Sequence, residues 1–527
     1  VRRPACTPHP GGLEGRGDEQ RTHALTLVVR PASLRRVWRI SGPGALISTA
    51  YMNSGSIEAN VESGSGAQFQ LLWLNLLTAL LSVLLQRLAL RLGAASRRDL
   101  AEHCTTFYCR APRYFKWALM EMAILSSDMQ NVIGTAVALH IISRAYVPLS
   151  AGVALSLLDT CALLLMDRAG PRTLQLLFAF FVIMIASTFG YEYFKVLPDQ
   201  ASVLKGIVVP ACEECSKNVY ILVVSLIGSG LTPHNLFLHS GLVKEIVDRE
   251  GFEAVQISGV NFALLMEVCV AVLVSYVFNV FITSAIGATV YGQTNSQLRE
   301  ECLSGGSPFA DVFPNDNETA TADIYTGGVF LGCRHGSMAL TMWSLGVLTA
   351  ALAGTLHSSR AGRFIMEGFL RIQWSHWRRA VVVRVLSATP MLFVALFADV
   401  TTLVLVNSVL NLVLSLHLPA AAIPAIALTA NRGVMGEHVS SKFSTASSLL
   451  LTSGVVATNV YLGVRLAYDW LPTSWGYILG AVLLGLGYLS HIVYLLLDMA
   501  SSCGASDRLS ACRFGQRYLN QPTSCPR

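Results

Sequence analysis

The sequence has little charge. Only 13% of its 527 residues are Asp, Glu, Lys or Arg, whereas 53% are hydrophobic. The charged fraction is about half that of an ordinary soluble domain, so the composition excludes a soluble globular protein and predicts a polytopic protein of the lipid bilayer. The net charge of +6 is spread over short loops without forming a basic patch, so we expect no nucleic-acid partner.

Motifs typical of enzymes are also missing. The candidate nucleophiles have no paired base in a soluble loop, and no glycine-rich loop has the spacing needed to hold phosphate. We therefore expect neither an enzyme nor a bound cofactor.

Long hydrophobic runs make up most of the chain. Seven runs approach or exceed the roughly 20 residues that span a bilayer, and three weaker runs and two interrupted ones bring the expected spans to about twelve. The uninterrupted runs are 68–93, 172–191, 259–291, 327–356, 381–399, 447–468 and 475–497, with the weaker ones at 118–142, 147–166 and 401–428.

We expect the other spans to be arranged around the two interrupted segments. Residues 48–58 (STAYMNSGSIE) and 227–240 (IGSGLTPHNLFLHS) break apolar runs with small polar residues, Gly and, in the second, Pro233. A helix broken at membrane depth leaves carbonyl groups that lipid cannot satisfy. In transporters built from two repeats, interruptions at corresponding points of the repeats are typical of the binding site.

Charge in the loops predicts the orientation. The loops after the second and eighth spans and the N-terminal tail are rich in Arg, which places them and both termini on the cytoplasmic side. The connection 292–326 is acidic and contains the sequon Asn317-Glu318-Thr319. We expect this connection to face outward or into a lumen, with Asn317 a candidate for glycosylation.

Composition divides the chain into three parts. We expect a disordered cytoplasmic tail over 1–40, a membrane domain over 41–499 and a short tail over 500–527.

Twelve cysteines are scattered along the sequence. Cys212 and Cys215 are candidates for a disulfide with each other or with Cys302. A zinc site at Cys212-Glu-Glu-Cys215 is less well supported, because no second ligand pair stands nearby. Cys104, Cys161 and Cys269 lie in or beside spans and are interpreted as small apolar residues.

Polar residues also occur inside the expected spans. The third span carries Glu121 and Asp128, which are either functional groups facing the bundle interior or members of an ion pair with an Arg near spans two, six or nine. Asn279, Asn407 and Asn411 fit hydrogen bonds between helices.

Several motifs resemble one family. Residues 232–240, Thr-Pro-His-Asn-Leu-Phe-Leu-His-Ser, resemble the sixth-helix signature Met-Pro-His-Asn-Leu-Tyr-Leu-His-Ser of the NRAMP (natural resistance-associated macrophage protein) family of proton-coupled divalent metal transporters. Further motifs in the same order resemble the family's third and fifth helices and its loops after helices eight and ten: 127–134, 188–193, 361–369 and 432–437. The chain is identified as a divergent member.

The resemblance implies an all-α LeuT-type fold. Helices one to five (41–193) and six to ten (219–428) would form inverted repeats, with helices one and six unwound at mid-membrane around the metal. The expected protein is a monomeric secondary transporter that moves a divalent cation, with or without protons, by alternating access. It would lie in the plasma membrane or in an endosomal or vacuolar membrane. The alternative is an NRAMP-like sensor or scaffold that has lost transport.

The departures from the family concern the ligands that the resemblance implies. Asp-Pro-Gly-Asn of the first helix is here Asn53-Ser54-Gly55-Ser56, so the negative charge is gone. In helix six Thr232 replaces the family's Met and Ser229 its Ala, and in helix ten His417 aligns with a Gln. The implied metal ligands are therefore Asn53, Ser56, Ser229, Thr232 and His417.

The proton route implied by the family is also altered. Its acidic partner on helix three aligns with Asn131, whereas His234, Asp128, Glu121 and Arg384 remain as candidates for a proton route or a gate. Coupling is expected to be looser, or to run through His234 and Asp128 alone.

Selectivity depends on the same substitutions. Uncharged oxygen ligands suit an ion that keeps several waters, such as Mg²⁺. A cavity-facing His417 would restore a preference for Mn²⁺, Fe²⁺ or another transition metal. Alternatively, His417 hydrogen-bonds Asn411 or a polar group of helix seven.

Overall fold

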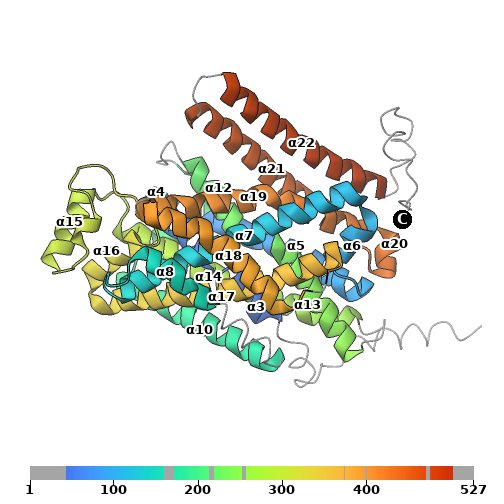
Figure 1. The fold of residues 1–527 in the computed structure, drawn as a ribbon, viewed down its shortest axis with the longest axis horizontal. Coiled ribbons are helices and arrows are strands. Elements are labelled where there is room, and N and C mark those ends of the chain that lie inside the picture. The colour runs from blue at the N-terminus through green and yellow to red at the C-terminus, as the bar shows by residue number, and fades with distance from the viewer. Residues whose placement is uncertain are drawn as a thin grey trace, which may run out of the picture.

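The computed structural model describes residues 43–159, 171–212, 219–251, 257–372, 374–397, 400–470 and 475–502. The expected N-terminal tail, the chain after Ser502, Cys161 and Cys215 lie outside these ranges. The described residues are almost entirely helical, and the long helices run along the longest axis of the molecule (Figure 1).

The first part of the chain begins with a broken helix. Its elements are α3 (Pro43–Ala50), α4 (Ser54–Ala67), α5 (Leu72–Ser96), α6 (Leu100–Phe107), α7 (Arg110–Ile142), α8 (Leu149–Leu155), η1 (Ser156–Leu158), α10 (Pro171–Val196) and α11 (Gln200–Val208).

The second part begins with another broken helix. Its elements are α12 (Val219–Gly230), α13 (His234–Glu250), α14 (Ile257–Thr289), α15 (Asn295–Ser304), η3 (Ala310–Val312), α16 (Thr326–His335), α17 (Ser337–Leu370), α18 (His376–Phe397) and α19 (Val400–Ala430). The chain continues through α20 (Arg432–Met435), η4 (Gly436–His438), α21 (Lys442–Trp470) and α22 (Trp475–Ser502).

Nine helical spans among the described residues are long and apolar enough to cross a bilayer, counting α12 and α13 as one. The other expected spans are the broken pair α3–α4, the shorter apolar helix at Leu149–Leu158, and α7. α7 is long enough but carries Lys116, Glu121 and Asp128 on its buried or half-buried surface, which lowers its mean hydropathy. These segments account for the twelve spans expected from the sequence.

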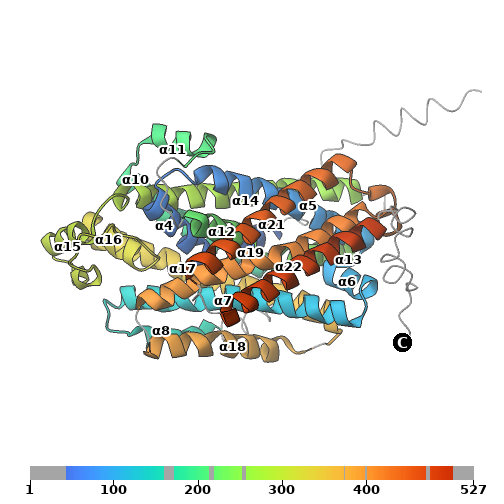
Figure 2. The same cartoon turned by 90° about the horizontal axis from the view of Figure 1, so that it is seen from above.

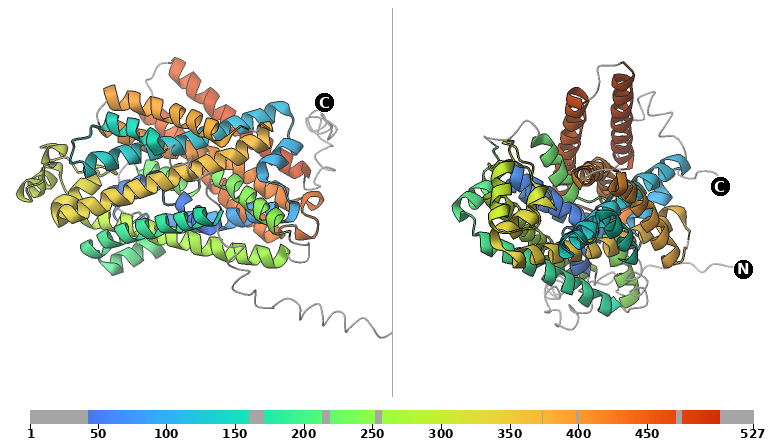
Figure 3. Two further views of the ribbon diagram at one scale, coloured as in Figure 1. Left: turned by 60° about the horizontal axis from the view of Figure 1, so that its bottom comes forward. Right: turned by 60° about the vertical axis from the view of Figure 1, so that its left-hand side comes forward.

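The broken helices lie at the centre of the bundle. α4 packs against α12 and α14, and α13 packs against α5 and α17, while α7, α17 and α19 enclose the rest. α21 and α22 project from this body on one side (Figure 3). They expose large apolar side chains such as Leu450, Tyr468 and Leu484, as expected of helices that face lipid.

The connection 292–326 is held to α16 by a disulfide that the sequence did not predict. Cys302 of α15 is bonded to Cys333 of α16, so the pairing of Cys302 with Cys212 or Cys215 is wrong. The reason is that α15 packs against α16, which places Cys333 opposite Cys302. Cys212 is also disulfide-bonded, and Cys104 and Cys269 are free thiols as expected.

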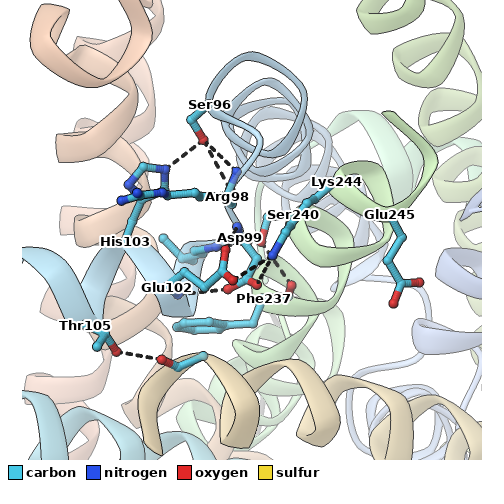
Figure 4. Close-up of polar contacts among 12 residues, drawn as sticks. Ser96, Arg98, Asp99, Glu102, His103, Thr105, Phe237, Ser240, Lys244 and Glu245 are labelled. Atoms are coloured by element: carbon cyan, nitrogen blue, oxygen red, sulfur yellow. Dashed lines mark hydrogen bonds and ion pairs between the residues drawn. The ribbon is translucent and has the colours of Figure 1, made fainter. Parts of the chain in front are cut away.

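Different helices lie at the two ends of the molecule. α15 and α16 lie at one end, and α6 and α13 lie towards the other (Figure 2). At the α6 end, Lys244 of α13 contacts Glu102 at 2.7 Å and Asp99 at 3.6 Å, and Ser240 Oγ accepts a hydrogen bond from the backbone N–H of Leu100 (Figure 4). α13 is thereby attached to the turn that follows α5 and to the start of α6.

This attachment leaves no room between α5 and α13. A Cβ atom added at Gly93 would lie 2.3 Å from the carbonyl oxygen of Ser240, which is backbone and has little freedom to move. We expect Gly93→Ala to destabilise the protein by about 1–3 kcal/mol through overpacking. Gly463→Ala is the matched control, because that glycine lies on α21 with nothing within 4 Å.

The measurement is the thermal unfolding midpoint of both purified variants in detergent. We expect the midpoint to fall for Gly93→Ala and to stay at the wild-type value for Gly463→Ala. Equal midpoints in the two variants would contradict the close approach of α5 and α13.

Candidate metal site

Both interrupted segments are broken in the structure. α3 ends at Ala50 and α4 begins at Ser54, with Asn53 as the N-cap of α4: its Oδ1 accepts a hydrogen bond from the backbone N–H of Ser56 at 2.8 Å. α12 ends at Gly230 and α13 begins at His234, with Pro233 as the N-cap. The prediction that these two helices lose their winding is confirmed.

At each break a helix ends, and a helix C-terminus attracts a cation. The C-terminal ends of α3 and α12 both point into the broken region, and the last carbonyl groups of a helix carry partial negative charge. Half-helix ends of this kind are known to coordinate cations in transporters.

The predicted ligands of the two breaks are buried. Asn53, Ser56, Ser229 and Thr232 are all 4% exposed or less. Asn53 Nδ2 donates to the Ala50 carbonyl, Ser56 Oγ donates to Asn279 Oδ1 on α14, and Ser229 Oγ donates to the Leu226 carbonyl. These oxygen atoms keep lone pairs for a ligand, but none of them carries a charge.

Hydrogen bonds connect the two breaks. Asn235 Nδ2 donates to Thr232 Oγ1, and the Asn235 side chain also interacts with the hydroxyl of Tyr51 at the end of α3. His357 of α17 lies between the same two helices: its Nε2 contacts Asn235 Oδ1, and its Nδ1 lies 3.2 Å from the Leu46 carbonyl oxygen. His357 was not among the residues singled out from the sequence.

Asn411 of α19 is a second residue that sequence reasoning missed as a site residue. Its Nδ2 donates to the Gly55 carbonyl in the first turn of α4 at 3.0 Å and to Ser225 Oγ of α12 at 3.1 Å. Its Oδ1 accepts from Gln130 Nε2 of α7 at 2.7 Å. Asn411 therefore joins α4, α12 and α7 at the place where the breaks meet.

His417 lies elsewhere. Its Nδ1 is 2.6 Å from the Val413 carbonyl oxygen of its own helix, and the histidine that interacts with it electrostatically is His491 of α22. Among the described residues His417 forms no hydrogen bond with Asn411 or α14, because two residues six positions apart lie about 120° from each other around the helix axis. The geometry therefore supports Asn411 rather than His417 as the α19 residue of the site.

The two carboxylates predicted on the third span, Glu121 and Asp128, form ion pairs. Asp128 contacts Arg384 of α18 at 2.8 Å, and Arg384 also binds Asp159. Glu121 contacts Arg379 at 3.3 Å. Of the two interpretations of Glu121 and Asp128, the structure therefore shows the ion pairs with arginine, and both arginines belong to α18.

His234 is not brought to Asp128. Its ring lies 5.8 Å from that of His357, and its Nδ1 is buried without a hydrogen-bond partner. Asn131 accepts a hydrogen bond from Ser54 Oγ at 3.0 Å and so supports the start of α4.

The site offers neutral oxygen donors to an ion. In the described ranges no group of three or more His, Cys, Asp or Glu side chains is arranged to hold a metal ion. A divalent cation between the breaks would contact amide, hydroxyl and carbonyl oxygens, which are the ligands of hard cations, and would keep part of its water.

Solved structures of the same fold exist. The chain is similar to crystal structures of two mutants of the Eremococcus coleocola manganese transporter, each with a TM-score of 0.75, 22% sequence identity, and coverage of 90% of this chain and 97% of that one. This likeness confirms the all-α LeuT-type fold with about twelve membrane helices.

Comparisons of sequence cover the same region. This chain is 40% identical to natural resistance-associated macrophage protein 1 of Gallus gallus over 477 residues, 90% of this chain and 85% of that protein. It is 39% identical to Protein Malvolio of Drosophila melanogaster over 494 residues, 92% of this chain and 82% of that protein. Residues 44–465 match the family described as natural resistance-associated macrophage protein-like, and the chain belongs to this family.

Proposed function

We propose that this protein carries a divalent metal cation across a membrane by alternating access. One observation supports the proposal most strongly: two helices are broken, the neutral oxygen atoms at both breaks are buried, and Asn235 links the two breaks through its contacts with Thr232 and Tyr51. Broken helices at this position are the usual binding element of secondary transporters. The manganese transporter of the same fold supports the class of substrate.

The proposed ligands are Asn53 and Ser56 of the first break, Ser229 and Thr232 of the second, and the amide of Asn411. All of them are oxygen donors without charge. A dication loses much hydration energy on entering a cavity of low dielectric constant, and no anionic ligand here offsets that loss. We therefore expect weak binding of a partly hydrated ion, with Mg²⁺ and Mn²⁺ accepted and softer metals no longer favoured.

Uptake into proteoliposomes tests the function itself. The purified chain is reconstituted, and uptake of Mn²⁺ and Mg²⁺ is measured against liposomes without protein. Saturable uptake of at least one ion is the expected result. Binding of Mn²⁺ without uptake would overturn the proposal and favour the transport-inactive sensor or scaffold.

Restoring a charge in the first break is expected to strengthen binding. Asn53→Asp keeps the N-cap of α4, because a carboxylate accepts the Ser56 N–H as the amide oxygen does. It adds a charge next to the ion, and we expect the Kd for Mn²⁺ to fall by about tenfold or more, measured by calorimetry.

Asn60→Asp is the control for this variant. It makes the same chemical change on α4, at a side chain bonded to Asn75 and Thr283 on the neighbouring helices. An unchanged Kd in Asn53→Asp would remove residue 53 from the site.

Alanine variants of α19 test which of its polar residues faces the ion. We expect Asn411→Ala to raise the Kd for Mn²⁺ several-fold, because it removes a proposed ligand whose amide also bonds α4 and α12 beside the breaks. His417→Ala should leave the Kd unchanged, because its imidazole bonds only to its own helix. The reverse pattern would return His417 to the site.

Proton coupling is proposed to be loose. Asn53 cannot titrate, Asp128 is engaged in an ion pair with Arg384, and none of the proposed ligands is a carboxylate that could accept a proton. We expect fewer protons than metal ions to enter, measured with a pH-sensitive dye inside proteoliposomes during Mn²⁺ uptake. Asn53→Asp should increase the proton flux per metal ion, and a proton flux equal to the metal flux in the wild type would contradict loose coupling.

A further inference from the structure

A group of acidic side chains lies on α4 between the first break and the outward connection. Glu58 and Glu62 are one helical turn apart on α4 and interact unfavourably, and both are near Asp323 in the segment that leads into α16. Glu58 is fully buried. Residues at this spacing share one face of a helix, so their like charges repel each other.

The partners of these carboxylates are few and neutral. Glu58 Oε2 accepts a hydrogen bond from the Ile324 N–H at 2.8 Å, and Glu62 Oε1 accepts one from Ser408 Oγ of α19. Asp323 Oδ1 accepts from the N–H groups of Tyr325 and Thr326 at the start of α16. Within the described part of the chain, no Lys, Arg or His forms an ion pair with any of the three carboxylates.

Several buried polar atoms beside them have no partner at all. Glu58 Oε1 and Glu62 Oε2 accept no hydrogen bond. Asn407 of α19 is fully buried and its side chain interacts with the Glu58 carboxylate, while its Oδ1 has no hydrogen-bond partner. A fully buried amide oxygen without a partner is rare in native proteins and needs a donor or cation that the chain itself does not supply.

From this geometry we infer that Glu58, Glu62 and Asn407 form a second cation site, which holds a partly hydrated divalent cation. Two carboxylate oxygens and one amide oxygen are the donors that hard divalent cations prefer. The cation would satisfy the unpaired oxygens and cancel the repulsion between the two glutamates. The Asp323 carboxylate already accepts hydrogen bonds from the start of α16, so it would attract the cation by its charge without being a ligand.

The chemistry of the site sets its strength. The described carboxylates do not form a cluster of three that could hold a bare ion, so water completes the coordination. Sites with few charged ligands bind Ca²⁺ with Kd values of about 10⁻⁴–10⁻³ M. The site is therefore expected to fill only when the ion is plentiful on the outward side.

Its place on α4 separates it from the central site. Glu58 and Glu62 follow Asn53 by five and nine residues, which corresponds to about 8 and 14 Å along the helix axis. The inference therefore does not require that Asn53 binds the ion.

Counting bound Mn²⁺ in variants tests the inference. The full chain is placed in nanodiscs of zwitterionic lipid and titrated with Mn²⁺ alone, and free Mn²⁺ is followed by its electron paramagnetic resonance signal. We expect Glu62→Gln to weaken one class of bound Mn²⁺ by about tenfold, since affinity follows the number of charged ligands. Glu318→Gln, which neutralises an exposed carboxylate of the outward connection, should bind as the wild type does.

Asn407→Ala is the second variant, because it removes a ligand without changing the charge, and it should also weaken this class. Asn53→Ala should leave it intact, whatever that variant does to the central site. Failure of the central proposal is thereby distinguished from failure of this one. Wild-type binding in both Glu62→Gln and Asn407→Ala would overturn the second site and indicate protonated glutamates instead.

Discussion

The structure depends on satisfying the backbone polar groups of two broken helices where lipid offers no hydrogen bond. Part of the solution is local: Asn53 caps α4 and also bonds the last carbonyl of α3. Other helices bond the turns that flank the first break, since Asn411 of α19 donates to the Gly55 carbonyl in the first turn of α4 and His357 of α17 lies against the Leu46 carbonyl of α3. The two parts of the broken helix are therefore held in place by polar residues that lie beside the proposed site.

Much of this arrangement could be predicted from the sequence, because a helix break is a local property. Gly, Pro233 and small polar residues within apolar runs mark both breaks without knowledge of the neighbouring helices. The same holds for the number of spans, which follows from the lengths of apolar runs. The disulfide partner of Cys302 could not be found in this way, because it depends on how α15 lies against α16.

The residues contributed by distant helices could not be predicted either. α19 is apolar on most of its surface, so the sequence does not show which of its polar residues faces the breaks. Packing against α22 decides it and directs His417 away from Asn411. His357 stands in no recognisable motif, and its partners are 311 and 122 residues away. A single sequence carries no signal for contacts of that range.

The break in the first helix does not require a negative charge at the site. An amide oxygen caps a helix as a carboxylate does, so Asn53 preserves the break while it removes the anion. Carboxylates remain further along α4, at Glu58 and Glu62. Under the two proposals above, a cation is attracted near these glutamates but held only weakly between the breaks. Passage through a membrane protein requires binding that is strong enough for entry and weak enough for release, and a neutral central site favours release.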